Sequence, residues 1–120
     1  MKKIRLYLCH KIGHSEELIK QFNQQNRNIN IELISSNESL KNQADFILHT
    51  FSPEFKSMQT IFNVVNDSNH FKGKTLFLVL NETDGFTPHQ IKSLKATGKI
   101  IKLNRGQWFD NWTDLLEFIH

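Results

Sequence analysis

Residues 46–53 read FILHTFSP, and this stretch decides the fold class that the sequence predicts. Apolar side chains occupy both odd and even positions between Phe46 and Phe51, so a strand formed here would be buried on both of its faces. Strands of that kind belong to parallel sheets covered by helices on both sides. Ser52 and Pro53 then supply an N-cap and a proline at the first helical position, which predicts a helix directly after the strand.

Outward from this stretch, strand and helix patterns alternate along the whole chain. Besides the strand at 46–51, we expect strands at residues 4–8, 30–34, 75–80 and 99–103. We expect helices near residues 15–22, around Leu40, from Pro53 to about residue 70, at 87–97 and at 112–119. This alternation predicts one domain, residues 1–120, with a five-stranded, mostly parallel, doubly wound sheet of the Rossmann or flavodoxin-like class and helices on both faces.

Three local signals set the expected helix boundaries. The spacing of Ser35 and Glu38 matches a capping box before the short helix around Leu40. The sequence TPHQ at residues 87–90 has an N-cap, a proline and an N3 glutamine in the right order for a helix start. Gly98 is expected to end that helix, so that residues 99–103 form the fifth strand.

Composition and charge limit the kinds of partner that the protein can bind and the cellular compartment in which we expect it. The formal net charge is +3, but the basic residues are scattered and answered by acidic ones, whereas nucleic-acid binding needs a concentrated basic surface. Cys9 is the only cysteine and cannot form an internal disulfide. No apolar run approaches the roughly 20 residues that span a bilayer. We therefore expect a cytoplasmic protein that binds neither nucleic acid nor membranes.

Several histidines suggest a metal site, but their spacing argues against it. His10 and His14 lie four residues apart, with Cys9 and His49 elsewhere, yet Gly13 breaks the helix that would align the first two. We therefore predict no metal and no cofactor. Cys9 itself is either a nucleophile activated by a neighbouring histidine or a small buried side chain at a strand end.

The predicted helix after Pro53 carries a row of polar side chains. They form either the solvated face of an amphipathic helix or part of a ligand site, because the start of this helix follows a central strand, where α/β proteins bind ligands. The residues concerned are Gln59, Asn63, Asn66, Asp67 and His70.

Several separate motifs match the motifs of one protein family and follow one another in the same order as in that family. They lie between Ala44 and Gly106, which is about half of the chain. The sequence TIFNVVNDSN at residues 60–69 is similar to a family helix that usually reads SIAEVVDDSN. The other matching stretches are ADFIL with Ser52-Pro53, GKTLF at 73–77, HQIKSLKATGK at 89–99 and NRG at 104–106. With these motifs the chain resembles the nucleoside 2-deoxyribosyltransferase-like family.

The resemblance implies a nucleoside site, but one whose catalytic residue is replaced. In such enzymes a glutamate of the matching helix attacks the anomeric carbon of the sugar, and here Asn63 stands at its position. A carboxamide has no anionic oxygen to act as the nucleophile. The pocket also departs from the family pattern at Cys9, His10, Ser57 and Gln59. The resemblance predicts a ligand crevice lined by Tyr7, His10, Ser52, Ser57, Gln59 and Asn63.

Three functional hypotheses follow. The leading one is a catalytically degenerate domain that binds a nucleoside or nucleotide. The alternative is an active N-glycosidase or deoxyribosyltransferase that uses another carboxylate, Asp67 or Asp45. The third is a structural or protein-interaction domain whose crevice is filled by aromatic side chains such as Phe51, Phe55 and Trp108. By analogy with the family, whose pockets often lie at subunit contacts, we also expect a homo-oligomer.

Overall fold

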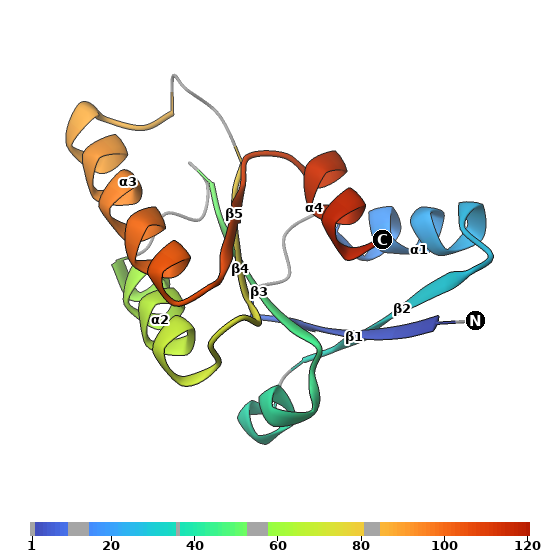
Figure 1. The fold of residues 1–120 in the computed structure, drawn as a ribbon. Coiled ribbons are helices and arrows are strands. Elements are labelled where there is room, and N and C mark those ends of the chain that lie inside the picture. Colours follow the sequence, from blue (N-terminus) through green and yellow to red (C-terminus); the bar gives the residue numbers. More distant parts are fainter. Residues whose placement is uncertain (1, 10–14, 36, 53–57, 81–84) are drawn as a thin grey trace.

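The computed structural model describes residues 2–9, 15–35, 37–52, 58–80 and 85–120. Five parallel strands form one sheet in the order β2-β1-β3-β4-β5, which confirms the predicted doubly wound, flavodoxin-like class (Figure 1). The strands are β1 (Lys2–Leu8), β2 (Ile29–Ile34), β3 (Phe46–Phe51), β4 (Thr75–Val79) and β5 (Gln107–Phe109). The helices are α1 (Ser15–Gln25), the 3-10 helix η1 (Glu38–Gln43), α2 (Met58–His70), α3 (Pro88–Leu103) and α4 (Trp112–Ile119).

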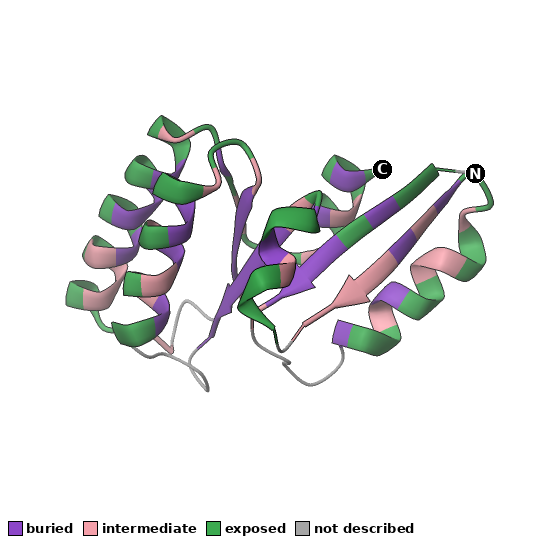
Figure 2. Ribbon diagram, turned by 90° about the horizontal axis from the view of Figure 1, so that it is seen from below, coloured by how far each residue is buried: buried purple, intermediate pink, exposed green. Residues whose placement is uncertain are grey.

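Helices cover both faces of the sheet. In Figure 1, α2 and α3 lie on one side of the strands, and α1 and α4 lie on the other. The core is divided in the same way: one cluster joins the strands to Ile19 of α1 and Leu115 of α4, and another joins them to Val64 of α2 and Leu94 of α3. The central strands are therefore buried on both faces, as the apolar run at residues 46–51 predicts, and Figure 2 shows this burial.

The strand order places a topological switch point between β1 and β3. From β1 the chain crosses to β2 on one side through α1, whereas β3, β4 and β5 follow on the other side. The pairing of β1 with β3 runs from Leu6 opposite Phe46 to Leu8 opposite Leu48, and the backbone N–H of Cys9 continues it by donating to the Leu48 carbonyl at 3.0 Å. In sheets of this kind, ligands bind beyond the carboxyl ends of the strands at the switch point.

The predicted fifth strand at residues 99–103 is wrong. These residues are the last turns of α3, which continues through Gly98, and β5 is the three-residue segment Gln107–Phe109. The side of α3 that faces the sheet carries Leu94, Thr97, Gly98 and Ile101, a helical spacing. Position 98 requires a glycine because the ring of Trp108 lies against it. A Cβ atom at this position would be 2.6 Å from Trp108 Cε3.

Helix starts that depend on neighbouring residues alone were predicted best. Thr87 caps α3 as expected, since its side-chain oxygen accepts a hydrogen bond from Gln90 N at 3.1 Å while Gln90 Oε1 accepts one from Thr87 N at 2.9 Å. The short helix around Leu40 is present as η1, but its cap is Asn37, whose Oδ1 accepts from Ser39 N at 3.1 Å, and not the capping box that starts at Ser35. The predicted start of a helix at Pro53 lies outside the described residues. Within the described ranges no helix is long and apolar enough to cross a membrane.

Candidate functional site

The switch point collects polar residues from three elements. Cys9 follows the last residue of β1, and Ser52 follows the last residue of β3. Because α2 leads from the end of β3 back to the start of β4, its first described turns lie toward the carboxyl edge of the sheet. Ser52 is buried, and so is Thr50, whose hydroxyl makes no hydrogen bond within the described part of the chain. Buried hydroxyls without a partner cost about 1–3 kcal/mol, which favours a role for that group.

A polar row on α2 runs from the surface into the molecule. Gln59, Asn63 and Asp67 are spaced by four residues and therefore share one side of the helix. Gln59 is exposed, Asn63 is half-buried and Asp67 is buried. The Gln59 side-chain amide donates to Asn63 Oδ1 at 2.9 Å. The amide nitrogen of Asn63 donates no hydrogen bond within the described ranges, so it is available to another acceptor.

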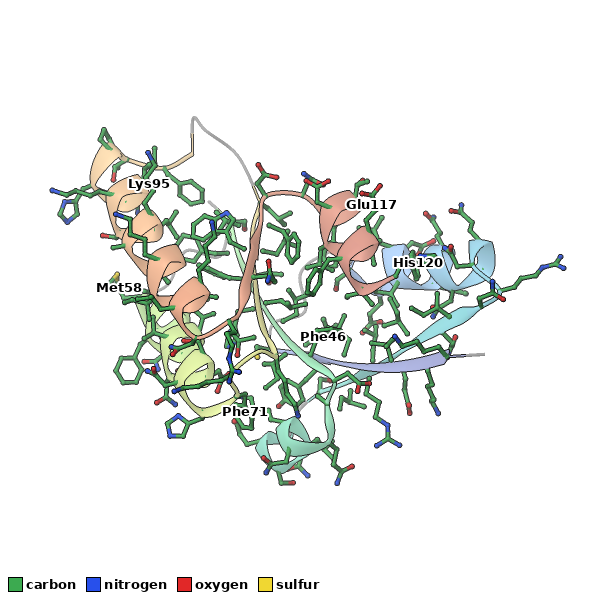
Figure 3. All side chains as sticks on the ribbon, in the orientation of Figure 1. Phe46, Met58, Phe71, Lys95, Glu117 and His120 are labelled. Carbon is green, nitrogen blue, oxygen red and sulfur yellow. The ribbon has the colours of Figure 1, made fainter. Side chains whose placement is uncertain are left out.

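The structure brings together only some of the predicted crevice residues. Gln59 and Asn63 are in direct contact, and Ser52 lies at the end of the neighbouring strand. Tyr7 is buried near the end of β1, on the side covered by η1, where it packs in a small cluster with Ala44, Ile47 and Phe71. Figure 3 shows Phe71 between the end of α2 and η1. His10 and Ser57 lie outside the described residues.

Asp67 belongs to a buried polar cluster with three side chains from other elements. His49 Nε2 of β3 lies 2.7 Å from Asp67 Oδ2, and Lys41 Nζ of η1 donates to the same oxygen at 3.0 Å and to Oδ1 at 3.3 Å. Cys9 Sγ lies 3.4 Å from His49 Nε2. Asp67, His49 and Lys41 are all less than 10% exposed: 4%, 1% and 6%. Lys41 also reaches the surface residue Glu38, at 2.7 Å, and lies over the Tyr7 ring.

The charges in this cluster stabilise one another. Burial by itself would raise the pKa of Asp67, but hydrogen bonds from His49 and Lys41 outweigh it and hold that pKa below its usual value. Burial would likewise lower the pKa of Lys41, yet its bonds to Glu38 and Asp67 raise it. The pair is therefore ionised across the physiological pH range, and each partner compensates the desolvation of the other.

The position of Asp67 corrects one expectation from the sequence. Asp67 does not lie on a solvated face of α2; it faces the sheet, whereas Asn66 and His70 are exposed as predicted. Sequence reasoning also missed Lys41 and His49 as its partners. The only local signal was weak: His49 is an ionisable residue inside a mostly apolar strand, and a buried imidazole requires a partner.

Cys9 has the environment of an unreactive thiol. Burial raises its pKa to about 12, and the neighbouring ammonium of Lys41 offsets this only in part. A nucleophilic cysteine needs a thiolate near neutral pH. Of the two interpretations of Cys9, the geometry favours the small, largely buried side chain.

The aromatic residues that could fill the crevice lie on the α3 side of the site. Phe51 stacks on Phe86, with ring centroids 5.5 Å apart, and both belong to the core cluster beneath α3. A cavity of about 360 Å³ lies between α3 and β5, and its walls include Phe86, Ile91, Leu94, Lys95, Trp108 and Asp110. Phe55 lies outside the described residues. Phe51 and Trp108 therefore pack in the core cluster that α2 and α3 cover.

No protein-family model matches the chain, and no curated protein is significantly similar to it.

Proposed function

We propose that this protein binds a nucleoside or nucleotide at the switch point, as a deoxyribosyltransferase-like domain without the family's nucleophile. The observation that carries the proposal is the pair Gln59 and Asn63 on the first turns of α2, beside the end of the central strand β3. The two carboxamides offer donors and acceptors together, which is what the edge of a base or the hydroxyls of a ribose require. The fold supports this location, since the crevice at a switch point is where such sheets bind ligands.

The burial gradient along α2 supports binding over catalysis. Asn63 is half-buried and keeps a donor available, whereas Asp67, one turn further, is buried and has both carboxylate oxygens bonded. A nucleophilic carboxylate must reach the anomeric carbon, and the bonds from Lys41 and His49 also make this one less basic. The alternative, catalysis through Asp67, therefore has less support than binding through Asn63. Asp45 is engaged elsewhere, since its Oδ2 accepts from Arg5 N at 2.7 Å.

Calorimetric titration with a panel of nucleosides and nucleotides tests the proposal. We expect at least one compound to bind with a dissociation constant between about 1 μM and 1 mM, and Asn63→Ala to weaken it about tenfold, the effect of losing one to two hydrogen bonds to the ligand. Asn66→Ala is the matched control, because Asn66 is the same residue type on the exposed side of the same helix. Failure of the whole panel to bind would overturn the proposal.

A reaction assay separates the proposal from its alternative. The protein is incubated with deoxynucleosides and a free base, and released or exchanged base is measured by chromatography. We expect no turnover. Turnover that is lost in Asp67→Asn while the variant stays folded would instead establish the glycosidase or transferase activity.

Self-association is part of the same proposal. Met58 and Phe62 follow each other on α2 at a spacing of four residues and are 77% and 68% exposed, next to Gln59 and Asn63. Figure 3 shows Met58 at the outer side of the helical layer. A second copy packed on these side chains would shield them and border the ligand site. Sedimentation measurements on the protein and on Phe62→Ser test this: we expect the variant to shift toward the monomer.

A further inference from the structure

Three potential metal ligands from three different elements converge on one buried point. Cys9 comes from the end of β1, His49 from the middle of β3 and Asp67 from the third turn of α2. Their ligand atoms all lie within 4.8 Å of one another. The proposed ligand-binding function rests on Gln59 and Asn63 and uses none of these three side chains.

The chemistry of the three groups suits one kind of ion. A thiolate, an imidazole and a carboxylate are the ligands of Zn²⁺, whereas Mg²⁺ and Ca²⁺ prefer oxygen alone. With bonds of about 2.3 Å to sulfur and about 2.0–2.1 Å to nitrogen and oxygen, neighbouring ligand atoms of a tetrahedral zinc site are about 3.3–3.6 Å apart. The distance of 3.4 Å between Cys9 Sγ and His49 Nε2 fits that spacing. The 2.7 Å between His49 Nε2 and Asp67 Oδ2 would have to widen by about 0.6 Å.

We propose that Cys9, His49 and Asp67 bind a zinc-like divalent cation, with three protein ligands and a fourth position for water. Two of the ligands sit on adjacent paired strands and the third on a helix packed against them, so rigid elements hold the geometry. Cys9, at the carboxyl end of β1, is the partly exposed member of the three. The proposal replaces the expectation from sequence that no metal is bound.

Lys41 acts as the competitor of the metal ion. Its ammonium lies 3.0 Å from the Asp67 oxygen that also contacts His49, and it neutralises this carboxylate. When the cation binds, it takes over the negative charge of Asp67 and the Cys9 thiol loses its proton to solvent. His49 Nε2 gives up the proton that bonds Asp67, the neutral ring carries its proton on Nδ1, and the Nε2 lone pair binds the metal. Lys41 then keeps Glu38, whose Oε2 lies 2.7 Å from Nζ, as its partner. A neutral side chain at position 41 would therefore favour metal binding.

Cobalt titration of protein freed of metal by a chelator tests the proposal. Co²⁺ substitutes for Zn²⁺ and reports its ligands: a bound thiolate gives a charge-transfer band in the near ultraviolet, and tetrahedral geometry gives intense visible bands. We expect both signals to saturate at one equivalent with a dissociation constant of about 10 μM or lower, and Zn²⁺ to abolish them by displacement. Absence of the charge-transfer band, or a band that never saturates, would overturn the proposal.

Variants identify the ligands and the competitor. Cys9→Ser should remove the charge-transfer band, and His49→Gln and Asp67→Asn should each weaken Zn²⁺ binding at least about tenfold. His70→Gln is the matched control, because His70 is an exposed histidine on the same helix as Asp67, and it should change nothing. Unaltered binding in both Cys9→Ser and His49→Gln would show that the ion sits elsewhere and overturn the assignment.

Lys41→Met gives a readout that a structural role alone would not produce. The variant loses an ion pair and should be less stable without metal, yet it should bind Zn²⁺ more tightly than the unmodified protein, because the competing charge is gone. Calorimetric titration of both proteins with Zn²⁺, after circular dichroism has confirmed that each is folded, measures the difference. Equal or weaker binding by the folded variant would contradict the place given to Lys41 in the proposed site.

Discussion

The ring of Trp108 in β5 lies directly against Gly98 in the middle of α3, where a Cβ atom would be only 2.6 Å from Trp108 Cε3 and 2.9 Å from Cζ3. The ring cannot move aside easily, because it also packs against the Phe77 ring, with centroids 5.3 Å apart and the two planes at 78°. Through this contact α3 packs directly against β5, the last strand of the sheet. It also explains why a residue that weakens helices is found inside a helix.

Gly98→Ala is therefore expected to destabilise the protein despite the better helix propensity of alanine. The propensity gain is about 1 kcal/mol, but displacing a packed indole ring costs about 1–3 kcal/mol. We expect a lower free energy of unfolding in urea. In a Trp108→Leu background the same change should become neutral or stabilising, so the two substitutions should not be additive. A stabilised Gly98→Ala single variant would contradict the close contact.

Asn23 protects the exposed edge of the sheet. β2 is an edge strand, and the Asn23 side chain pairs with the backbone of Ile31 in its middle: Nδ2 donates to the carbonyl at 3.0 Å and Oδ1 accepts from the N–H at 2.8 Å. Asn23→Ala should lower the free energy of unfolding by about 1–3 kcal/mol and promote aggregation, because the freed edge can pair with another chain. Urea denaturation and light scattering on heating measure the two effects. Gln24→Ala, at an exposed position of the same helix, should alter neither.

Sequence patterns predicted the features that depend on residues close in the chain. The apolar run from Phe46 to Phe51 gave the parallel class of the sheet, and the Thr87 to Gln90 spacing gave the start of α3. The predicted end of α3 was wrong. Locally, a strand is favoured by the glycine at position 98 and by the β-branched pair Ile100 and Ile101. The contact that explains Gly98 inside the helix is with Trp108, and it is a tertiary one.

The buried cluster escaped prediction for the same reason. Lys41 and His49 contact Asp67, but they lie 26 and 18 residues before it in the sequence. No local sequence pattern predicts such a contact. The helical period placed Asp67 beside Asn63 and Gln59 correctly, but it could not tell which part of that row turns toward the sheet. The packing of α2 against β3 and the contact of Asp67 with Lys41 of η1 decide this.

The capping box of α3 gives a third prediction. Thr87→Ala removes the side-chain oxygen that accepts from Gln90 N, and the cap also fixes the point where the chain enters the helix. We expect a loss of about 1 kcal/mol in the free energy of unfolding. Thr113→Ala is the comparison, since Thr113 is an exposed threonine inside α4, and its removal should change stability by less than about 0.5 kcal/mol. Similar losses of unfolding free energy in the two variants would mean that the capping hydrogen bond does not stabilise the protein.

The Asp67 carboxylate gives the fourth prediction, a pH-dependent one, for protein kept free of metal by a chelator. Because hydrogen bonds and charges hold its pKa below that of an unfolded aspartate, the stabilisation is complete above the unfolded value of about 3.9 and is lost as the pH falls through the folded-state pKa.

Breaking a buried ion pair costs about 3–5 kcal/mol, so Asp67→Asn should be less stable than the unmodified protein by that amount near pH 7. The gap should begin to narrow below about pH 4, where the aspartate of the unfolded chain takes up a proton, and it should close as the pH falls through the lower pKa of the folded carboxylate. Urea unfolding between pH 7 and pH 2.5 measures both curves, with Asp110→Asn, at an exposed position, as the control that should follow the unmodified protein. A gap of constant size across that range would show that the charge of Asp67 does not stabilise the fold, and that its hydrogen bonds act independently of ionisation.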